Sequence, residues 1–395
     1  MNRKVYVTGC GMISCIGDNF EDMTDSVCKG ISGIGPITIL DTIHRNKMIA
    51  GEVKYSDTEL ASIAGIELNK GITRTVLLGL IAAREALKSA NLPGYSDLAF
   101  ISGTTVGGMV STEKYYRDFL TNDSRNEFIK SHDCGDSTER IALFLGLNGY
   151  LATINTACSS AANALMAGAR LIKSGKASRV LAGGVDALSK FTLNGFNTLM
   201  IVDPDLCKPF DENRNGLNLG EGAGYFVLES EEATGNRYPV CEISGWGNAN
   251  DAFHQTASSP DGRGPYLSMK AALEQSGLLP GQINYINAHG TATQNNDLSE
   301  GIAIERLFTS RIPYISSTKP MTGHLLGASG AIEAGISIIS LINNIIPENL
   351  NFKTKMKELQ FVPQTETTHY PELRHVMSNS FGFGGNNTTL LFSKC

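Results

Sequence analysis

Apolar residues along the chain alternate between short runs typical of buried strands and longer stretches with helical spacing. Residues 5–8 form the first strand-like run, and Arg74–Ala90 carries apolar side chains at every third or fourth position. Residues 98–101 are predicted as the next strand, and a small-residue helix at 159–174 precedes a further strand at 179–182. Strands that alternate with helices in this way predict an α/β fold.

Short motifs recur in the same order in the two halves of the chain. Residues 85–93 end a predicted helix, residues 272–280 repeat that pattern, and each is followed by a strand and a Gly-Thr turn. Residues 7–11 are echoed by 243–247. Two helices also share a spacing of small residues, namely Ala164, Ala167 and Gly168 in one and Ala331, Ala334 and Gly335 in the other.

This repetition predicts a duplicated fold whose halves span residues 1–235 and 236–395. Two similar α/β halves can pack around a pseudo-two-fold axis, which would bring the region of Cys158 beside residues 319–324. Small residues on both helices favour close packing in a buried layer. Two generic α/β domains joined by a linker are the alternative, but the repeated glycine and small-residue positions favour duplication.

The composition is that of an ordinary globular protein, because 42% of the 395 residues are hydrophobic and 18% are charged. The net charge of -6 argues against a general affinity for nucleic acid. No apolar run reaches the roughly 18 residues of a membrane span. The N-terminal residues also lack the apolar stretch of a signal peptide, so we expect a cytoplasmic protein without a membrane segment.

Eight scattered cysteines without a C-x-x-C pair indicate free thiols rather than a disulfide framework. Cys158 lies between a predicted strand and the small-residue helix. A thiol at a helix N-terminus has a lowered pKa, because the helix dipole and the free N–H groups stabilise the thiolate. The tight turn could also aim a backbone N–H at a developing oxyanion. A buried structural cysteine is the alternative, and spacing alone leaves both open.

Two histidines of the second half lie in Gly/Thr-rich turns, at topological positions that match each other. His289 follows a predicted strand, and His324 precedes the second small-residue helix. Two neutral imidazoles could donate N–H bonds to one oxyanion. Cys158 and both histidines could instead bind zinc, but no paired ligand spacing supports that site. Two segments, residues 216–224 and 382–385, are rich in glycine, but neither gives the G-x-G-x-x-G pattern of a dinucleotide-binding site.

Five segments together resemble the β-ketoacyl-[acyl-carrier-protein] synthases, closest to the type II elongating (KAS I/II-like) group of the thiolase superfamily. These segments are residues 155–160, 209–216, 288–293, 317–324 and 379–385, which occur in the family's order over nearly the whole chain. The resemblance implies a thiolase-like duplicated five-layer αβαβα fold. It also implies an acyltransferase that needs no metal and no redox cofactor.

By this resemblance, Cys158 accepts the acyl chain from the carrier's phosphopantetheine. His289 and His324 then stabilise the enolate that forms when a malonyl thioester loses carbon dioxide. That carbanion attacks the acyl group on Cys158 in a Claisen condensation. The resemblance also implies supporting roles. The backbone N–H groups of Cys158 and Phe383 form an oxyanion hole, and the Phe383 ring is an aromatic gate. Lys319 and Glu333 support the histidines, whereas Thr291 and Thr293 contact pantetheine.

The segment from Ser111 to Tyr150 differs from the usual fatty-acid enzymes, because it lacks their Pro/Phe-rich loop. Its residues 131–140 are similar to ketosynthases of aryl-polyene-type pigment pathways. By this resemblance we expect chain elongation of the fatty-acid or the aryl-polyene type. We place Val106 near the floor of the acyl pocket, with an ordinary core valine as the equal alternative.

The expected partner is an acyl carrier protein, and the expected assembly is a homodimer, with a heterodimer also open. Carrier proteins are acidic, so a local basic rim is needed for docking; we expect Lys70, Arg74 and Lys208 to supply it. A non-catalytic chain-length-factor-like subunit is the first rival function, although such subunits typically lack the cysteine. A thiolase or acyl-CoA synthase is the second rival, although the pair of histidines argues against it.

Overall fold

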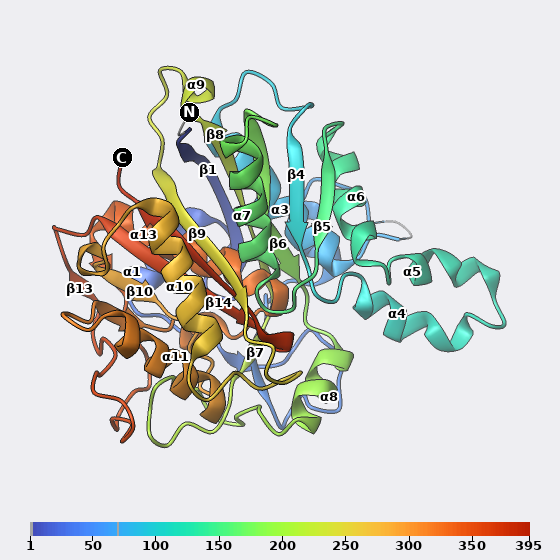
Figure 1. Ribbon diagram of the computed structural model, residues 1–395. Coiled ribbons are helices and arrows are strands. Elements are labelled where there is room, and N and C mark those ends of the chain that lie inside the picture. The colour runs from blue at the N-terminus through green and yellow to red at the C-terminus, as the bar shows by residue number, and fades with distance from the viewer. Residues whose placement is uncertain (1–2, 69–70) are drawn as a thin grey trace.

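Ten strands form one mixed sheet in the order β11-β10-β14-β15-β9-β1-β8-β6-β4-β5. This computed structural model describes residues 3–68 and 71–395 (Figure 1). The ten strands are β1 (Val5–Ser14), β4 (Ala99–Gly103), β5 (Leu151–Ile154), β6 (Arg179–Asp186), β8 (Gly222–Ser230), β9 (Cys241–Asn250), β10 (Tyr285–Asn287), β11 (Tyr314–Ser316), β14 (His375–Gly382) and β15 (Asn386–Ser393).

Each half of this sheet has the same strand order and the same strand directions. In the first half, β1 and β8 are antiparallel, β8 and β6 are antiparallel, and β6, β4 and β5 are parallel. Strands β9, β15, β14, β10 and β11 repeat this arrangement in the second half. The halves join where Tyr6 and Val7 of β1 pair with β9. This repeated topology confirms the duplicated α/β fold.

Helices form three layers around the two halves of the sheet. Helix α3 (Arg74–Ala90) packs on β1 and β8, and α10 (Arg263–Ser276) packs on β9 and β15. Between the halves, α7 (Ser160–Lys173) packs on β6 and β4, while α13 (Ser329–Asn343) packs on β14. Helices α7 and α13 also contact each other. The layers therefore follow one another as αβαβα.

The hydrophobic core is divided according to these layers. One cluster joins α7 and α13 with the inner faces of the sheet, and Ala161, Ala164, Ala331 and Ala334 within it are fully buried. A second cluster lies under α3, and a third lies under α10 and α11 (Gln294–Leu307). The small residues of α7 and α13 therefore permit the close packing of the central layer, as predicted from their spacing.

The glycines of β1 and β9 explain one of the sequence echoes. A Cβ atom added to Gly11 would lie 2.0 Å from the carbonyl oxygen of Ala82 on α3. A Cβ atom added to Gly247 would lie 2.1 Å from the carbonyl oxygen of Ser268 on α10. The strand predicted at residues 5–8 is therefore longer in the structure. It continues to Ser14, because these glycines serve helix contact rather than chain reversal.

The stretch Leu326–Asn343 corrects the expectation that no apolar run is long enough to span a membrane. It has 18 residues with a mean hydropathy of 1.4, but 89% of it is buried inside the protein. Most of it is α13, whose residues from Ser329 to Leu341 are all buried. A helix that is buried on every side is what the middle of five layers requires.

An arm formed by α4 (Met109–Tyr115) and α5 (Asn126–Lys130) extends away from the body beside α6 (Cys134–Leu145) (Figure 1). The start of β1 and the C-terminal end of the chain lie close together at another end of the molecule. The remaining helices and strands are α1 (Phe20–Cys28), α2 (Asp57–Ile63), α8 (Lys190–Thr198), α9 (Glu231–Thr234), α12 (Lys319–Thr322), β2 (Gly35–Pro36), β3 (Ile49–Gly51), β7 (Leu219–Gly220), β12 (Ile345–Ile346) and β13 (Thr368–His369).

Candidate active site

Cys158 lies in the turn between β5 and α7, and its side chain is buried. The preceding residue, Ala157, has a φ of 52°, in the left-handed region that non-glycine residues rarely adopt. This strained turn directs the Cys158 sulfur toward the backbone N–H groups of Phe383 and of Cys158 itself, which hydrogen-bond to it. Two N–H groups beside the sulfur are also close to where the oxygen of a thioester attacked by that sulfur would lie.

The acidity of Cys158 differs from what its position at a helix N-terminus alone would favour. Burial raises the pKa of the thiol to about 11, although the N–H group of Phe383 and the charge of Lys319 act in the opposite direction. The helix N-terminus therefore does not produce a thiolate at neutral pH, because removal of water from the sulfur outweighs it. Burial therefore favours the protonated thiol of Cys158 near neutral pH.

His289 follows β10, and its backbone is held by a buried carboxylate. The N–H groups of His289 and Gly290 donate to the two oxygens of Glu300 at 2.9 and 2.8 Å. In the side chain, Nδ1 lies 3.3 Å from Nζ of Lys319. A lysine ammonium can only donate, so Nδ1 accepts and the imidazole carries its proton on Nε2.

His324 is fixed in the same tautomer by different partners. Its Nδ1 accepts a hydrogen bond from the N–H of Leu326 at 3.0 Å and lies 3.1 Å from Oγ of Ser329. Because a backbone N–H can only donate, the proton of the neutral ring again sits on Nε2. The two rings are 5.5 Å apart between centroids and nearly perpendicular.

Both histidines are uncharged near neutral pH. Burial holds the pKa of His289 well below its usual value, and the charge of Lys319 acts in the same direction. The pKa of His324 is lowered by the same two causes. The site therefore offers two neutral N–H donors rather than two imidazolium ions.

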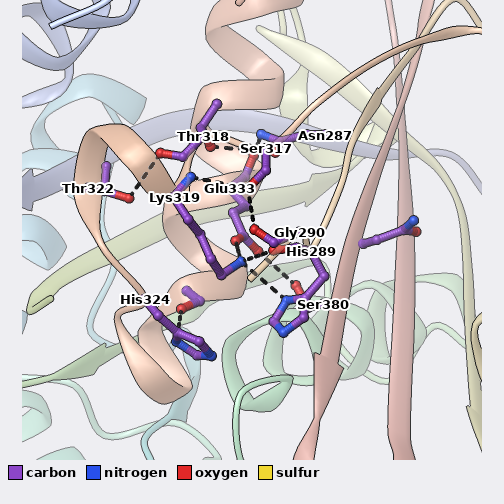
Figure 2. A network of polar contacts seen from close by, with 12 residues as sticks. Asn287, His289, Gly290, Ser317, Thr318, Lys319, Thr322, His324, Glu333 and Ser380 are labelled. Atoms are coloured by element: carbon purple, nitrogen blue, oxygen red, sulfur yellow. Dashed lines mark hydrogen bonds and ion pairs between the residues drawn. The ribbon is translucent and has the colours of Figure 1, made fainter. Parts of the chain in front are cut away.

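The Nζ atom of Lys319 lies between His289 and Glu333 and contacts both (Figure 2). It donates to the carbonyl oxygen of His289, to Nδ1 of His289 and to Oε1 of Glu333. These contacts use all three N–H groups of the ammonium. Ser380 donates to the other oxygen of Glu333 at 3.3 Å. The lysine predicted to support the histidine region is therefore placed to orient His289.

A cavity of about 370 Å³ brings the predicted residues together. Thr291 and Thr293 form part of its wall, and their hydroxyl oxygens lie 2.9 Å apart. Such a cavity suits a substrate that enters from one side and reacts at the buried end. The predicted residues among its lining are Cys158, His289, His324, Thr291, Thr293 and Phe383.

Sequence reasoning missed Phe196, which also lines the cavity. Its ring stacks on Phe383 with centroids 5.7 Å apart and presents an edge to His324 at 6.3 Å. Phe196 lies on α8, an ordinary amphipathic helix whose sequence gives no chemical signal. Val106, by contrast, is absent from the described cavity lining and packs in a cluster with Leu193 and Leu326.

The prediction that Arg74 belongs to a basic docking rim is wrong. Its side chain is buried and pairs with Glu221 through bonds of 2.9 and 2.7 Å, with Asp57 a further 3.1 Å contact. A cation neutralised in the interior cannot attract a carrier protein, and its role is structural. Lys208 is half-buried beside Asp203 and Asp211 and remains a prediction. Lys70 lies outside the described residues.

The zinc alternative has no support in residues 3–68 and 71–395. No group of three or more His, Cys, Asp or Glu side chains there is placed to hold a metal ion. The Nδ1 atoms of both histidines already accept hydrogen bonds from within the protein.

Comparison with known proteins decides the family. The model for "Beta-ketoacyl synthase, N-terminal domain" matches residues 2–234, and the model for the C-terminal domain matches residues 240–353. The chain belongs to the β-ketoacyl synthase family. As a ketosynthase it is an acyltransferase with a thiolase-like fold, as the resemblance implied.

Relatives of this ketosynthase match it over its whole length. The 3-oxoacyl-[acyl-carrier-protein] synthase 2 of Staphylococcus aureus (strain COL) is 33% identical, covering 100% of this chain and 99% of the relative. The solved ishigamide ketosynthase/chain length factor is similar at 30% identity, with a TM-score of 0.93 and 100% of both chains covered. A ketosynthase in complex with its chain length factor from Xenorhabdus doucetiae gives 28% identity and a TM-score of 0.83, covering 100% of this chain and 98% of that one.

Proposed function

We propose that this ketosynthase catalyses the decarboxylative Claisen condensation of malonyl-carrier with an acyl chain held on Cys158. The observation that carries the proposal is the grouping of Cys158, His289 and His324 around one cavity. A thiol nucleophile and two uncharged N–H donors are the groups that the reaction needs. The name of the Staphylococcus aureus relative supports the same activity.

The first step transfers the acyl chain to Cys158. The sulfur attacks the thioester carbonyl of the acyl-carrier, and the N–H groups of Cys158 and Phe383 stabilise the resulting oxyanion. The intermediate expels the carrier's pantetheine sulfur and leaves an acyl thioester on Cys158. The proton lost by the Cys158 thiol balances the one gained by the departing thiol. Because the thiol is protonated at rest, deprotonation accompanies attack rather than preceding it.

The second step forms the carbanion from malonyl-carrier. Nε2–H of His289 and of His324 donate to the thioester oxygen of the malonyl group. When the bond to the carboxylate breaks, carbon dioxide leaves and its electron pair becomes an enolate held by those two donors. Neutral imidazoles suit this step, because they hold the enolate without protonating it readily.

The third step joins the two fragments. The carbanion attacks the acyl carbonyl on Cys158, and the same two backbone N–H groups stabilise the oxyanion. Collapse of this intermediate expels the Cys158 sulfur as a thiolate, which takes a proton from solvent; this is the one proton that the condensation consumes overall. The product is a 3-oxoacyl chain on the carrier, longer by the two malonyl carbons that remain.

Other predicted residues take supporting roles in this proposal. Lys319 and Glu333 orient His289, and the hydroxyls of Thr291 and Thr293 contact pantetheine. Phe383 gates the approach to Cys158, with Phe196 as its stacking partner. Val106 limits the acyl pocket from beyond the described cavity lining. Residues 1–235 and 236–395 are the two repeats that supply the thiol and the histidines, respectively.

The proposed partner is an acyl carrier protein that brings both substrates, and the proposed assembly is a dimer. Solved relatives include a ketosynthase bound to a chain length factor, so a heterodimer is included with the homodimer. Fatty-acid and aryl-polyene-type elongation are both compatible with the site. The cytoplasmic location stays a prediction.

The direct test uses the purified chain with acyl-carrier and malonyl-carrier. The proposal predicts a 3-oxoacyl-carrier product and an acylated Cys158 peptide in mass spectra. The matched Cys158→Ala variant should give no condensation while still decarboxylating malonyl-carrier. Condensation by that variant would end the assignment of Cys158 as the nucleophile.

The second candidate is a chain-length-factor-like subunit that pairs with a separate ketosynthase. The two solved relatives that contain chain length factors favour keeping it. The thiol and two histidines gathered at one cavity argue for a catalytic subunit instead. Product formed only after addition of a second subunit, and independent of Cys158, would support this candidate.

A further inference from the structure

Asp186, the last residue of β6, is fully buried and connects the two repeats. Its Oδ1 accepts from the hydroxyl of Thr104 at 2.6 Å and from the N–H groups of Thr105 and Val106 at 3.1 and 3.2 Å. Its Oδ2 accepts from the N–H of Thr105 at 2.9 Å and from that of Gly327 at 2.7 Å. Residues 104–106 belong to the first repeat, whereas Gly327 belongs to the second.

The donors at residues 104–106 and the donor at Gly327 are each connected to the candidate active site. On one side, the hydroxyl of Thr105 donates to the carbonyl oxygen of Ala157 at 3.2 Å, immediately before Cys158. On the other side, Gly327 directly follows Leu326, whose N–H holds Nδ1 of His324. One carboxylate is therefore linked by short chains of contacts to both the nucleophile turn and the His324 loop.

The carboxylate has no counter-ion among the described residues, since its polar contacts are to N–H and hydroxyl groups. Burial raises its pKa to about 6 despite these donors. A buried acid without an ion pair costs stability that an apolar side chain would not. The space around Gly327 is equally constrained, because a Cβ atom there would lie 2.8 Å from Oδ2 of Asp186.

We propose that Asp186 is a positioning residue that aligns the Cys158 turn with the His324 loop across the two repeats. Asp186 touches neither the substrate nor the reacting atoms. It fixes the distance between Cys158 and His324, which must act on one pair of thioesters. The inference rests on the proposed function, because alignment is measured through condensation.

The first test is Asp186→Asn in the full chain. The carboxamide has nearly the same size, but it presents N–H groups where one oxygen accepted, so it faces either the Thr105 or the Gly327 N–H with a donor. A misplacement of about 1 Å can cost about 100-fold in rate. We expect kcat for condensation to fall by about 10- to 100-fold, with the KM for malonyl-carrier changed less than about threefold. Decarboxylation in a Cys158→Ala background should fall as well.

The second test, Thr105→Val, removes only the contact with the Ala157 carbonyl. It should slow single-turnover acylation of Cys158 by about 3- to 10-fold, within the range of lost alignment. Decarboxylation in the Cys158→Ala background should stay unchanged, because the Gly327 contact remains. A slower acylation with an unchanged decarboxylation in Thr105→Val tests the proposal even if Asp186→Asn fails to fold. An equal loss of the acylation and decarboxylation rates, or a loss of neither, would overturn it.

Glu229→Gln is the matched control. Glu229 is a fully buried carboxylate on the same pair of strands, at the opposite end from Asp186. Its variant should lose thermal stability and keep kcat. A comparable loss of kcat in Glu229→Gln, or a folded Asp186→Asn with both rates within about twofold of wild type, would overturn the positioning role. Wild-type protein that forms no 3-oxoacyl product would instead contradict the proposed function itself.

Discussion

The backbone N–H of Leu326 donates to Nδ1 of His324 at 3.0 Å and thereby places the imidazole proton on Nε2. Lys319 imposes the same tautomer on His289 by donating to its Nδ1. Two unrelated contacts thus leave two equivalent N–H donors at one cavity. Decarboxylation should depend on each of them.

Replacing His324 with Ala in a Cys158→Ala background should slow malonyl-carrier decarboxylation by about 100- to 1,000-fold, as expected when one donor to an oxyanion is lost. His324→Gln should retain part of the rate, since its side-chain amide can still donate. Conversion of malonyl- to acetyl-carrier, followed by mass spectrometry, measures the rate. The exposed His369, changed to Ala, is the control and should have no effect. Full activity of His324→Ala would refute the two-donor account.

The raised pKa of Cys158 predicts a distinctive pH dependence of alkylation. With a pKa of about 11, the thiolate fraction is small at pH 7 and grows about tenfold with each pH unit below that pKa. The rate at which iodoacetamide labels the Cys158 peptide should therefore rise about tenfold per unit from pH 7 to 10. A rate that levels off near pH 7 would show a thiolate at rest, as the position of Cys158 at a helix N-terminus alone would favour.

Lys319→Met should affect both stability and pH dependence. Glu333 would be left as a buried charge without its partner, at a cost of about 3–5 kcal/mol in the free energy of unfolding. Lys319 also lowers the pKa of His289, so its loss raises that pKa and lets the imidazole protonate at a higher pH. The acidic limb of the decarboxylation profile should move upward in pH.

The double variant Lys319→Met/Glu333→Leu separates these two effects. It removes the unpaired charge and should recover part of the stability, but the acidic limb should stay shifted because the lysine charge is still missing. Urea unfolding and the pH profile of decarboxylation measure the two quantities. A wild-type profile in either variant would exclude Lys319 as an influence on His289.

Arg74→Met should destabilise the protein without weakening carrier binding. The substitution leaves the buried Glu221 carboxylate without its cation, which costs about 3–5 kcal/mol. The KM for acyl-carrier should not change in the folded fraction. Lys208→Glu is the contrasting variant, expected to raise that KM while leaving the unfolding free energy nearly unaltered. A folded Arg74→Met protein with a raised KM would restore Arg74 to the docking rim.

The duplication could be predicted from sequence because the repeated residues obey local constraints. Gly11 and Gly247 recur because α3 and α10 approach β1 and β9 in the same way. Cys158 and His324 could be singled out because each lies beside a helix start in a turn of small residues. Patterns of this kind can be recognised in the sequence even when the contacts between distant residues are not known.

The features that sequence reasoning missed all depend on contacts between residues far apart in the chain. Arg74 pairs with Glu221, 147 residues away, so its burial has no local signature. Phe196 reaches the cavity only because α8 packs beside Phe383. Cys158 is less acidic than its helix position suggests, since burial by both repeats determines its pKa.

The most direct measurement is the mass of the carrier after the isolated chain has been given acyl-carrier and malonyl-carrier. The account predicts a 3-oxoacyl-carrier two carbons longer than the starting acyl group, formed only when Cys158, His289 and His324 are all present. An unchanged acyl-carrier with the wild-type chain, or the same elongated product from the Cys158→Ala chain, would contradict it.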